Sequence, residues 1–188
     1  MEKQKGEKTK YRLAEAAKEC MKETPVDALT VTRITEVCGV TRQTFYRNFL
    51  DKYDLINWYF GKLLDESFAQ MGYGKTVYEG LTRKFEFIEK ERIFFAAAFR
   101  SDDTNCLKEH DYELIFQFYQ DLIRRKTGRG PGEEILFQLR LYCRGSIDMT
   151  VEWLLSERRF CPRRMARLLV DAMPARLAAL FQEIGVLG

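Results

Sequence analysis

The chain is poor in histidine, the side chain most often used in general acid–base catalysis. Its 188 residues include one histidine, His110, and they contain neither a G-x-S-x-G nucleophile motif nor a P-loop. A lone histidine without companions is a weak basis for acid–base catalysis or for a metal site. The sequence therefore predicts no catalytic residues, no metal site and no cofactor, and it does not predict an enzyme.

Long apolar runs and cysteine pairs are also missing. The longest uninterrupted apolar run, residues 93–99, is too short to span a bilayer, and residues 1–10 are polar and charged, unlike a signal peptide. The five cysteines are scattered and form no C-x-x-C pair. We therefore expect neither membrane insertion nor export, and a location in the reducing cytoplasm.

Charge of one sign is not in large excess. Hydrophobic residues make up 46% of the chain, charged residues make up 31%, and the net charge is only +3, so nucleic-acid binding has to be argued from where the charges lie. The arginines at 158, 159, 163, 164 and 167 fit a solvated interhelical turn better than a site for an acidic partner.

Helical periodicity runs through the whole sequence. Apolar residues recur at spacings of three and four, without strand-like alternation, so we expect an all-α fold of about nine helices. Thr9 is expected to cap the first helix and Pro25 to stop it. Breaks between later helices are expected at Gly72–Gly74 and at residues 128–132. Pro162 should open a final helix, which Pro174 should kink or split.

Residues 30–55 carry the pattern of a helix-turn-helix. Thr30 can cap a helix that ends at Gly39, where a residue with positive φ costs little. Thr41 can then cap a short second helix, and Asp51 the helix that follows, which should run to about Gln70. Within the second helix the aromatic side chains can turn inward while polar ones stay outside; these aromatic residues are Phe45, Tyr46 and Phe49.

The stretch 34–52 resembles the DNA-binding domain of the TetR/AcrR-type family of bacterial transcriptional regulators. The resemblance covers about the first third of the chain and is specific because it combines a hinge glycine, three aromatics and a lysine at the next helix start: Gly39, Phe45, Tyr46, Phe49 and Lys52. Thr35 and Cys38 stand where relatives usually carry alanine, and both are small enough for close helix packing. The resemblance implies a three-helix DNA-binding domain over 1–54 and a helical regulatory and dimerisation domain over 55–188.

Two sets of side chains are candidates for DNA contacts. Arg42 and Gln43, at the start of the second helix, are the long side chains best placed to reach base edges, since arginine suits guanine and glutamine suits adenine. Hydroxyls and cations suit the phosphate backbone, and the candidates for those contacts are Thr32, Thr41, Thr44, Tyr46, Arg47 and Lys52.

The second half resembles, more loosely, the C-terminal domain of a firmicutes-type branch of the same family. That resemblance implies that the last two long helices pair with those of a second copy in a four-helix bundle. The candidate interface residues are Gly145, Trp153, Ala172, Ala175 and Ala179. Packing inside one subunit is the open alternative, because periodicity cannot separate the two.

A cluster of aromatics could line a pocket for a small-molecule effector: Phe85, Phe95, Phe99, Phe116, Tyr119 and Tyr142. An aromatic stripe at helical spacing is more often plain core. The resemblance implies a homodimeric repressor that binds a palindromic operator on double-stranded DNA. A partner-dependent activator, or an interaction module of the same fold, is the alternative.

Overall fold

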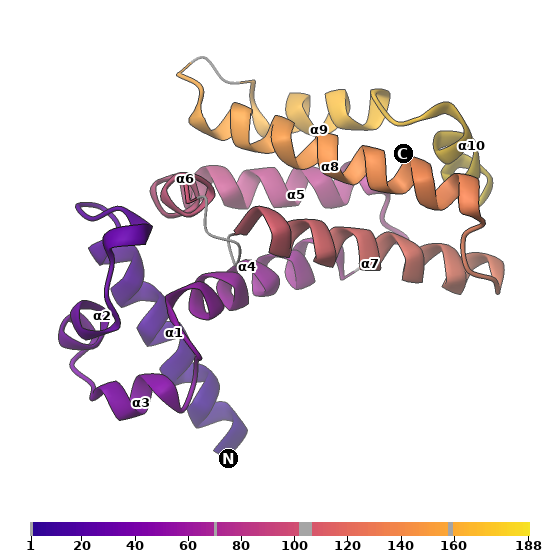
Figure 1. The fold of residues 1–188 in the computed structure, drawn as a ribbon. Coiled ribbons are helices and arrows are strands. Elements are labelled where there is room, and N and C mark those ends of the chain that lie inside the picture. The colour runs from indigo at the N-terminus through magenta and orange to yellow at the C-terminus, as the bar shows by residue number, and fades with distance from the viewer. Residues whose placement is uncertain (1, 70, 102–106, 158–159) are drawn as a thin grey trace. The chain divides into compact units, whose positions relative to one another are not determined.

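A computed structural model describes residues 2–69, 71–101, 107–157 and 160–188. Over these ranges it contains ten α-helices, one 3-10 turn and no strand, which confirms the all-α class (Figure 1). The elements are α1 (Glu2–Cys20), η1 (Val26–Ala28), α2 (Val31–Cys38), α3 (Arg42–Tyr46), α4 (Lys52–Phe68), α5 (Val77–Lys90), α6 (Arg92–Phe99), α7 (Leu107–Thr127), α8 (Glu133–Leu155), α9 (Pro162–Asp171) and α10 (Ala175–Glu183). Cys106, Arg158 and Arg159 lie outside the described residues.

Most expected breaks are confirmed, and one helix start is wrong. Gly72 and Gly74 adopt φ values of 82° and 91° in the turn before α5, and Pro174 separates α9 from α10. Helix α1, however, begins at Glu2 and passes through Thr9 without a break. Lysine, glutamate and glutamine are good helix formers, so residues 2–10 extend the helix although they supply no buried side chain in the described part.

The chain divides into two compact units. The first contains residues 1–62 and 91–110, and the second contains residues 63–90 and 111–188. Of the three boundaries, two fall inside helices, in α4 and in α7, and the third falls between α5 and α6. The functional boundary expected after residue 54 stays a prediction.

The core of the first unit is rich in aromatic pairs. Tyr59 contacts Phe94 with ring centroids 5.3 Å apart, and Phe60 contacts Phe95 at 5.6 Å. Because α6 supplies Phe94 and Phe95 and α4 supplies Tyr59 and Phe60, these contacts fix α6 against the first half of α4.

The second unit contains a buried ion pair within its apolar core. The Lys84 ammonium donates to both carboxylate oxygens of Asp111 at 3.0 Å, and neither side chain is more than 2% exposed. Close by in sequence, Phe85 packs against Trp153 with centroids 5.3 Å apart. Helix α5 therefore presents a cation and an aromatic ring to the interior, one toward α7 and one toward α8.

The described residues contain neither a candidate membrane-spanning helix nor a candidate metal site. None of the helices there is both long and apolar enough to cross a membrane. Nor does the same part of the chain bring together three or more His, Cys, Asp or Glu side chains as metal ligands.

Replacing Lys84 with Met should lower the free energy of unfolding by about 3 to 5 kcal/mol, because Asp111 would keep a buried charge without its cation. Urea unfolding followed by circular dichroism measures the change. Lys90→Met, on the exposed end of α5, is the matched control and should shift stability by less than about 0.5 kcal/mol. The double variant Lys84→Met/Asp111→Leu should recover most of the lost stability. A Lys84→Met variant that is as stable as the Lys90→Met control would contradict the prediction.

Candidate nucleic-acid interface

Side-chain caps define the ends of α2 and α3, as the sequence predicted. Thr30 Oγ1 accepts a hydrogen bond from Arg33 N at 3.2 Å, and Thr41 Oγ1 accepts one from Thr44 N at the same distance. Between the helices, Gly39 has φ 68° and ψ 37°. Only glycine adopts this left-handed conformation at little cost, so Gly39 allows the sharp turn from α2 into α3.

Helix α3 is held to its scaffold by two aromatic side chains. Phe45 is 0% exposed and Phe49 is 2% exposed, with ring centroids 5.8 Å apart. Phe49 also contacts Trp58 of α4 at 5.6 Å. The expectation that these two phenylalanines turn inward is confirmed.

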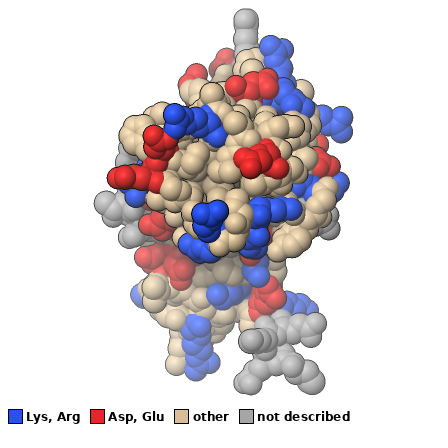
Figure 2. Space-filling model, turned by 90° about the vertical axis from the view of Figure 1, so that its right-hand side faces the viewer, with Lys and Arg blue, Asp and Glu red and all other residues tan. Residues whose placement is uncertain are grey.

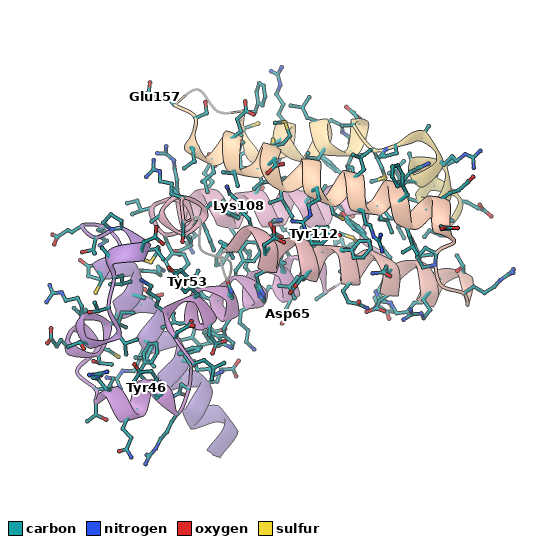
Figure 3. All side chains as sticks on the ribbon, viewed as in Figure 1. Tyr46, Tyr53, Asp65, Lys108, Tyr112 and Glu157 are labelled. Carbon is teal, nitrogen blue, oxygen red and sulfur yellow. The ribbon has the colours of Figure 1, made fainter. Side chains whose placement is uncertain are left out.

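The opposite side of α3 is polar and exposed. Arg42, Gln43 and Arg47 are all exposed, and Tyr46, labelled in Figure 3, is 51% exposed. The expectation that Tyr46 turns inward is therefore wrong. Residues four apart share a helix face, so Tyr46 lies beside Arg42, whose guanidinium is 5.9 Å from the tyrosine ring centroid.

The three threonines expected to contact phosphate lie close to the helix starts. Thr41 and Thr44 are brought together at the start of α3, with hydroxyl oxygens 3.0 Å apart. Thr32 is exposed in the first turn of α2, and its carbonyl accepts a hydrogen bond from the Thr35 hydroxyl at 2.9 Å. That bond satisfies the buried Thr35 hydroxyl, which explains how threonine is tolerated at this packed position.

Lys52 makes contacts that the sequence did not indicate. Its ammonium donates to the carbonyl oxygens of Asp27 at 2.8 Å and of Leu29 at 2.9 Å. These two carbonyls belong to η1 and the residue after it, just before α2. Lys52 thus ties the first turn of α4 to the entry of the helix-turn-helix.

Asp27 joins the same network through its side chain. Its Oδ1 accepts hydrogen bonds from Ser101 Oγ at 2.6 Å and from the Tyr53 hydroxyl at 3.1 Å. These bonds, the one from Ser101 first, hold the pKa of the Asp27 carboxyl below its ordinary value, because they stabilise its charged form. A single acidic residue therefore connects η1 with the start of α4 and the segment after α6.

Two further side chains that sequence reasoning missed support the helix ends. Arg12 of α1 donates to the carbonyl of Cys38 at 3.1 Å, beside the Gly39 turn. Asn48 Nδ2 donates to the Thr44 carbonyl at 2.7 Å, which satisfies a carbonyl at the end of α3. No local pattern marks Arg12, because its partner is distant in sequence, whereas an asparagine two residues after the end of a short helix is a recognisable capping signal.

Comparison with protein families accounts for both parts of the chain. Residues 13–59 match the family described as bacterial regulatory proteins, tetR family, and residues 75–174 match a transcriptional regulator C-terminal region. The second match alone covers more than half of the chain. The chain belongs to the TetR family. Comparison with curated protein sequences gives no significant match.

Solved structures show the same fold at low sequence identity. The activator DhaS of a dihydroxyacetone kinase operon has a TM-score of 0.62 at 16% identity, over 91% of this chain and 97% of DhaS. NalD of Pseudomonas aeruginosa, the secondary repressor of the MexAB-OprM multidrug efflux pump, has a TM-score of 0.60 at 19% identity, over 90% and 95%. RolR in complex with resorcinol has a TM-score of 0.52 at 17% identity, over 97% and 95%. These likenesses establish the TetR fold.

The aromatic residues expected to line a ligand pocket are mostly core residues of one unit or the other. Phe95 and Phe99 are buried in the first unit, where both rings contact Phe60. The second unit contains the other four, of which only Phe116 is half-buried rather than buried: Phe85, Phe116, Tyr119 and Tyr142. Burial raises the pKa of both tyrosines, and the Tyr142 hydroxyl donates to the Leu169 carbonyl at 2.9 Å.

The residues expected at a dimer interface fall into two groups. Gly145 of α8 and the alanines at 172, 175 and 179 are exposed. Trp153 is only 4% exposed, and its indole N–H donates to the Phe160 carbonyl at 2.7 Å, so its side chain belongs to the core of its own protomer. On the face drawn in Figure 2, basic and acidic side chains lie side by side between broad areas of other residues.

Lys52→Met should lower the free energy of unfolding by about 1.5 to 3 kcal/mol, because the carbonyls of Asp27 and Leu29 would lose hydrogen bonds to a charged donor. Thermal or urea unfolding of the purified variant measures this without DNA. The control is Lys22→Met, whose ammonium makes an exposed pair with Glu19 and should matter by less than about 0.5 kcal/mol. If Lys52→Met is as stable as the wild type, the two hydrogen bonds from Lys52 do not stabilise the segment before α2.

Proposed function

We propose that this TetR-family protein is a homodimeric transcriptional regulator that represses its target by binding a palindromic operator. The single observation that carries the proposal is the two-sided character of α3. Its buried face is fixed by Phe45, and its outer face presents Arg42 and Gln43 to solvent. A short helix with this division of side chains suits insertion into the major groove.

Within this proposal the exposed side chains divide into base readers and phosphate binders. Arg42 reads guanine through its two acceptors, and Gln43 reads adenine. The phosphate binders are Thr32, Thr41, Thr44, Tyr46, Arg47 and Lys52. An ammonium has three N–H donors, so Lys52 can bind a phosphate with its third donor while it holds the Asp27 and Leu29 carbonyls.

Pairing of two copies supplies the twofold symmetry that a palindromic operator matches. The exposed small residues of α8 and α10, Gly145, Ala175 and Ala179, together with Ala172, permit close approach of helices from a second copy. Two reading helices then lie about one turn of DNA apart, or a multiple of it.

A small-molecule effector would change DNA binding by binding one arrangement of the two DNA-reading domains better than another. The aromatic residues of the second unit that were expected to line a pocket, Phe85, Phe116, Tyr119 and Tyr142, are the candidates for contact with a small aromatic ligand. The resorcinol complex of RolR supports beginning a ligand screen with compounds of that class.

Activation through a partner protein is the second candidate mode, and the likeness to the activator DhaS favours testing it. Transcription in vitro from the promoter beside the gene distinguishes the modes. A repressor lowers transcript yield on its own, whereas an activator of this kind raises it only when its partner is added.

Gel shifts with the intergenic DNA beside the gene test the proposal directly. We expect a complex that weakens steeply with salt, because phosphate contacts release counterions. A protein that forms no salt-sensitive complex with that DNA, although it is folded, would be an interaction module and not a DNA-binding regulator.

Arg42→Ala should weaken operator binding by about 5- to 150-fold, equivalent to about 1 to 3 kcal/mol, and should relax preference at one base pair. Gln43→Ala should do the same at a neighbouring base pair. Binding to a library of operators with single base changes measures both effects. A loss of affinity that is uniform across the library would assign these residues to phosphate contact instead.

Arg47→Ala should weaken binding to every operator sequence alike and reduce the slope of log K against log salt by about one. Salt titrations of wild type and variant on specific and unrelated DNA provide the comparison. The matched control is Arg124→Ala, a change at an exposed residue of α7, which should leave the slope of log K against log salt unchanged. A change in sequence preference without a change in slope would make Arg47 a base reader.

A further inference from the structure

The solvent face of α8 carries a ridge of large apolar side chains. Phe137 is 69% exposed, Leu141 is 62% exposed and Met149 is 45% exposed. Phe137 and Leu141 lie four positions apart and Met149 lies eight positions after Leu141, with Gly145 midway, so the three side chains form one ridge that is interrupted at Gly145. Exposure of three such side chains in a row on one helix is typical of a surface that another molecule covers.

Gly145 has no explanation within the protomer. It stands in the interior of a 23-residue helix, where glycine is less favourable than alanine. A Cβ added to Gly145 would meet nothing within 4 Å, so packing inside the protomer does not require a glycine. A missing side chain at the centre of an exposed ridge does permit close approach of a second helix.

Charges on the same face are ordered along the helix. Arg140 and Arg144 precede Gly145, and Asp148 and Glu152 follow it, all of them exposed. The guanidinium of Arg144 lies 3.6 Å from the ring centroid of Tyr112 on α7, which is labelled in Figure 3 and fixes the arginine beside the ridge. Near the glycine, the exposed face is therefore basic just before Gly145 and acidic just after it, while Glu133 and Glu134 lie in the first turn of the helix.

We infer that the α8 helices of two copies pair antiparallel and cross at Gly145, with Arg144 of each copy facing Asp148 of the other. This inference rests on the homodimer of the proposed function and specifies its register. Antiparallel pairing places Arg140 and Arg144 of one helix against Asp148 and Glu152 of its mate, whereas parallel pairing would oppose like charges at these positions. Because the pairing is twofold, each contact occurs twice.

The same register also matches the apolar groups. Leu141 and Met149 lie four residues before and after Gly145, so Leu141 of each copy meets Met149 of the other. Phe137 borders a shallow hollow of about 410 Å³ that is also lined by Glu133, Glu134, Gln138 and Arg176. Since this hollow lies about two turns before the crossing point, it faces the last turns of α8 from the second copy.

Charge reversal in two separate variants tests the register. Arg144→Asp and Asp148→Arg homodimers each place like charges at both symmetric contacts, so the dissociation constant of each should rise at least about tenfold. Mixed in equal amounts, the two variants should form a heterodimer that restores affinity to within about threefold of wild type, because both contacts then pair Arg with Asp. Sedimentation velocity over a concentration series, with one variant fluorescently labelled, measures all three species.

The chain offers a matched control for the charge changes. Arg124→Asp and Asp121→Arg alter an exposed Arg–Asp pair on α7, away from the ridge, and should leave dimerisation unchanged alone and mixed. Circular dichroism melting of each α8 variant shows whether loss of the Arg144–Tyr112 contact unfolds the protomer. If both variants are folded but their mixture forms the heterodimer no more tightly than each variant forms its homodimer, the proposed register is wrong.

Gly145→Gln provides a second test that does not depend on charge. The protomer has room for the new side chain, so its melting temperature should stay the same or rise, while the dissociation constant of the dimer should increase at least about tenfold. An unchanged dissociation constant would overturn the crossing at Gly145.

Gel shifts on the same samples separate this inference from the proposed function. If the wild type binds DNA and the α8 variants dimerise with the dissociation constant of the wild type, the register is wrong and the proposed function stands. If the heterodimer preference appears but no sample binds DNA, the register stands and the proposed function fails.

Discussion

Burial of Phe45 and Phe49 is the constraint on which the DNA-binding part of the structure depends. Helix α3 is only five residues long, and a helix of that length is not stable by itself. It persists because the ring of Phe45 within it and the ring of Phe49 three residues after its end are removed from water, each contributing about 2 to 3 kcal/mol. Because the apolar side is fixed against the core, the side chains of Arg42, Gln43 and Arg47 point to solvent. The same packing arrangement therefore produces both the buried hydrophobic contact and the exposed polar surface.

The surroundings of α3 are fixed by polar contacts that cross long sequence distances. Lys52 holds the carbonyls before α2, Arg12 holds the carbonyl at the end of α2, and Asp27 accepts hydrogen bonds from Tyr53 and Ser101. Each of these bonds satisfies a backbone or carboxylate oxygen that would otherwise depend on water. The helix-turn-helix is therefore positioned by the start of α4 and by the segment after α6 as well as by its own two helices.

The second unit combines a well-filled interior with an unusually apolar exterior on α8. Phe85, Trp153, Tyr119 and the Lys84–Asp111 pair are all withdrawn from solvent. On the same helix as Trp153, Phe137 and Leu141 remain more than 60% exposed. Position on α8 thus decides whether an aromatic residue stabilises the protomer or is left for another molecule.

Local signals in the sequence were enough to predict the helical class, the caps at Thr30 and Thr41, the turn at Gly39 and the division of the last helix at Pro174. Each depends on the conformational preferences of a few neighbouring residues, which a sequence displays directly. Tertiary structure alone decided that Tyr46 faces outward, that Lys52 binds the Asp27 and Leu29 carbonyls, and that Trp153 lies inside its protomer. Those outcomes depend on which distant segments meet, and helical periodicity gives the spacing of a face without naming what the face will contact.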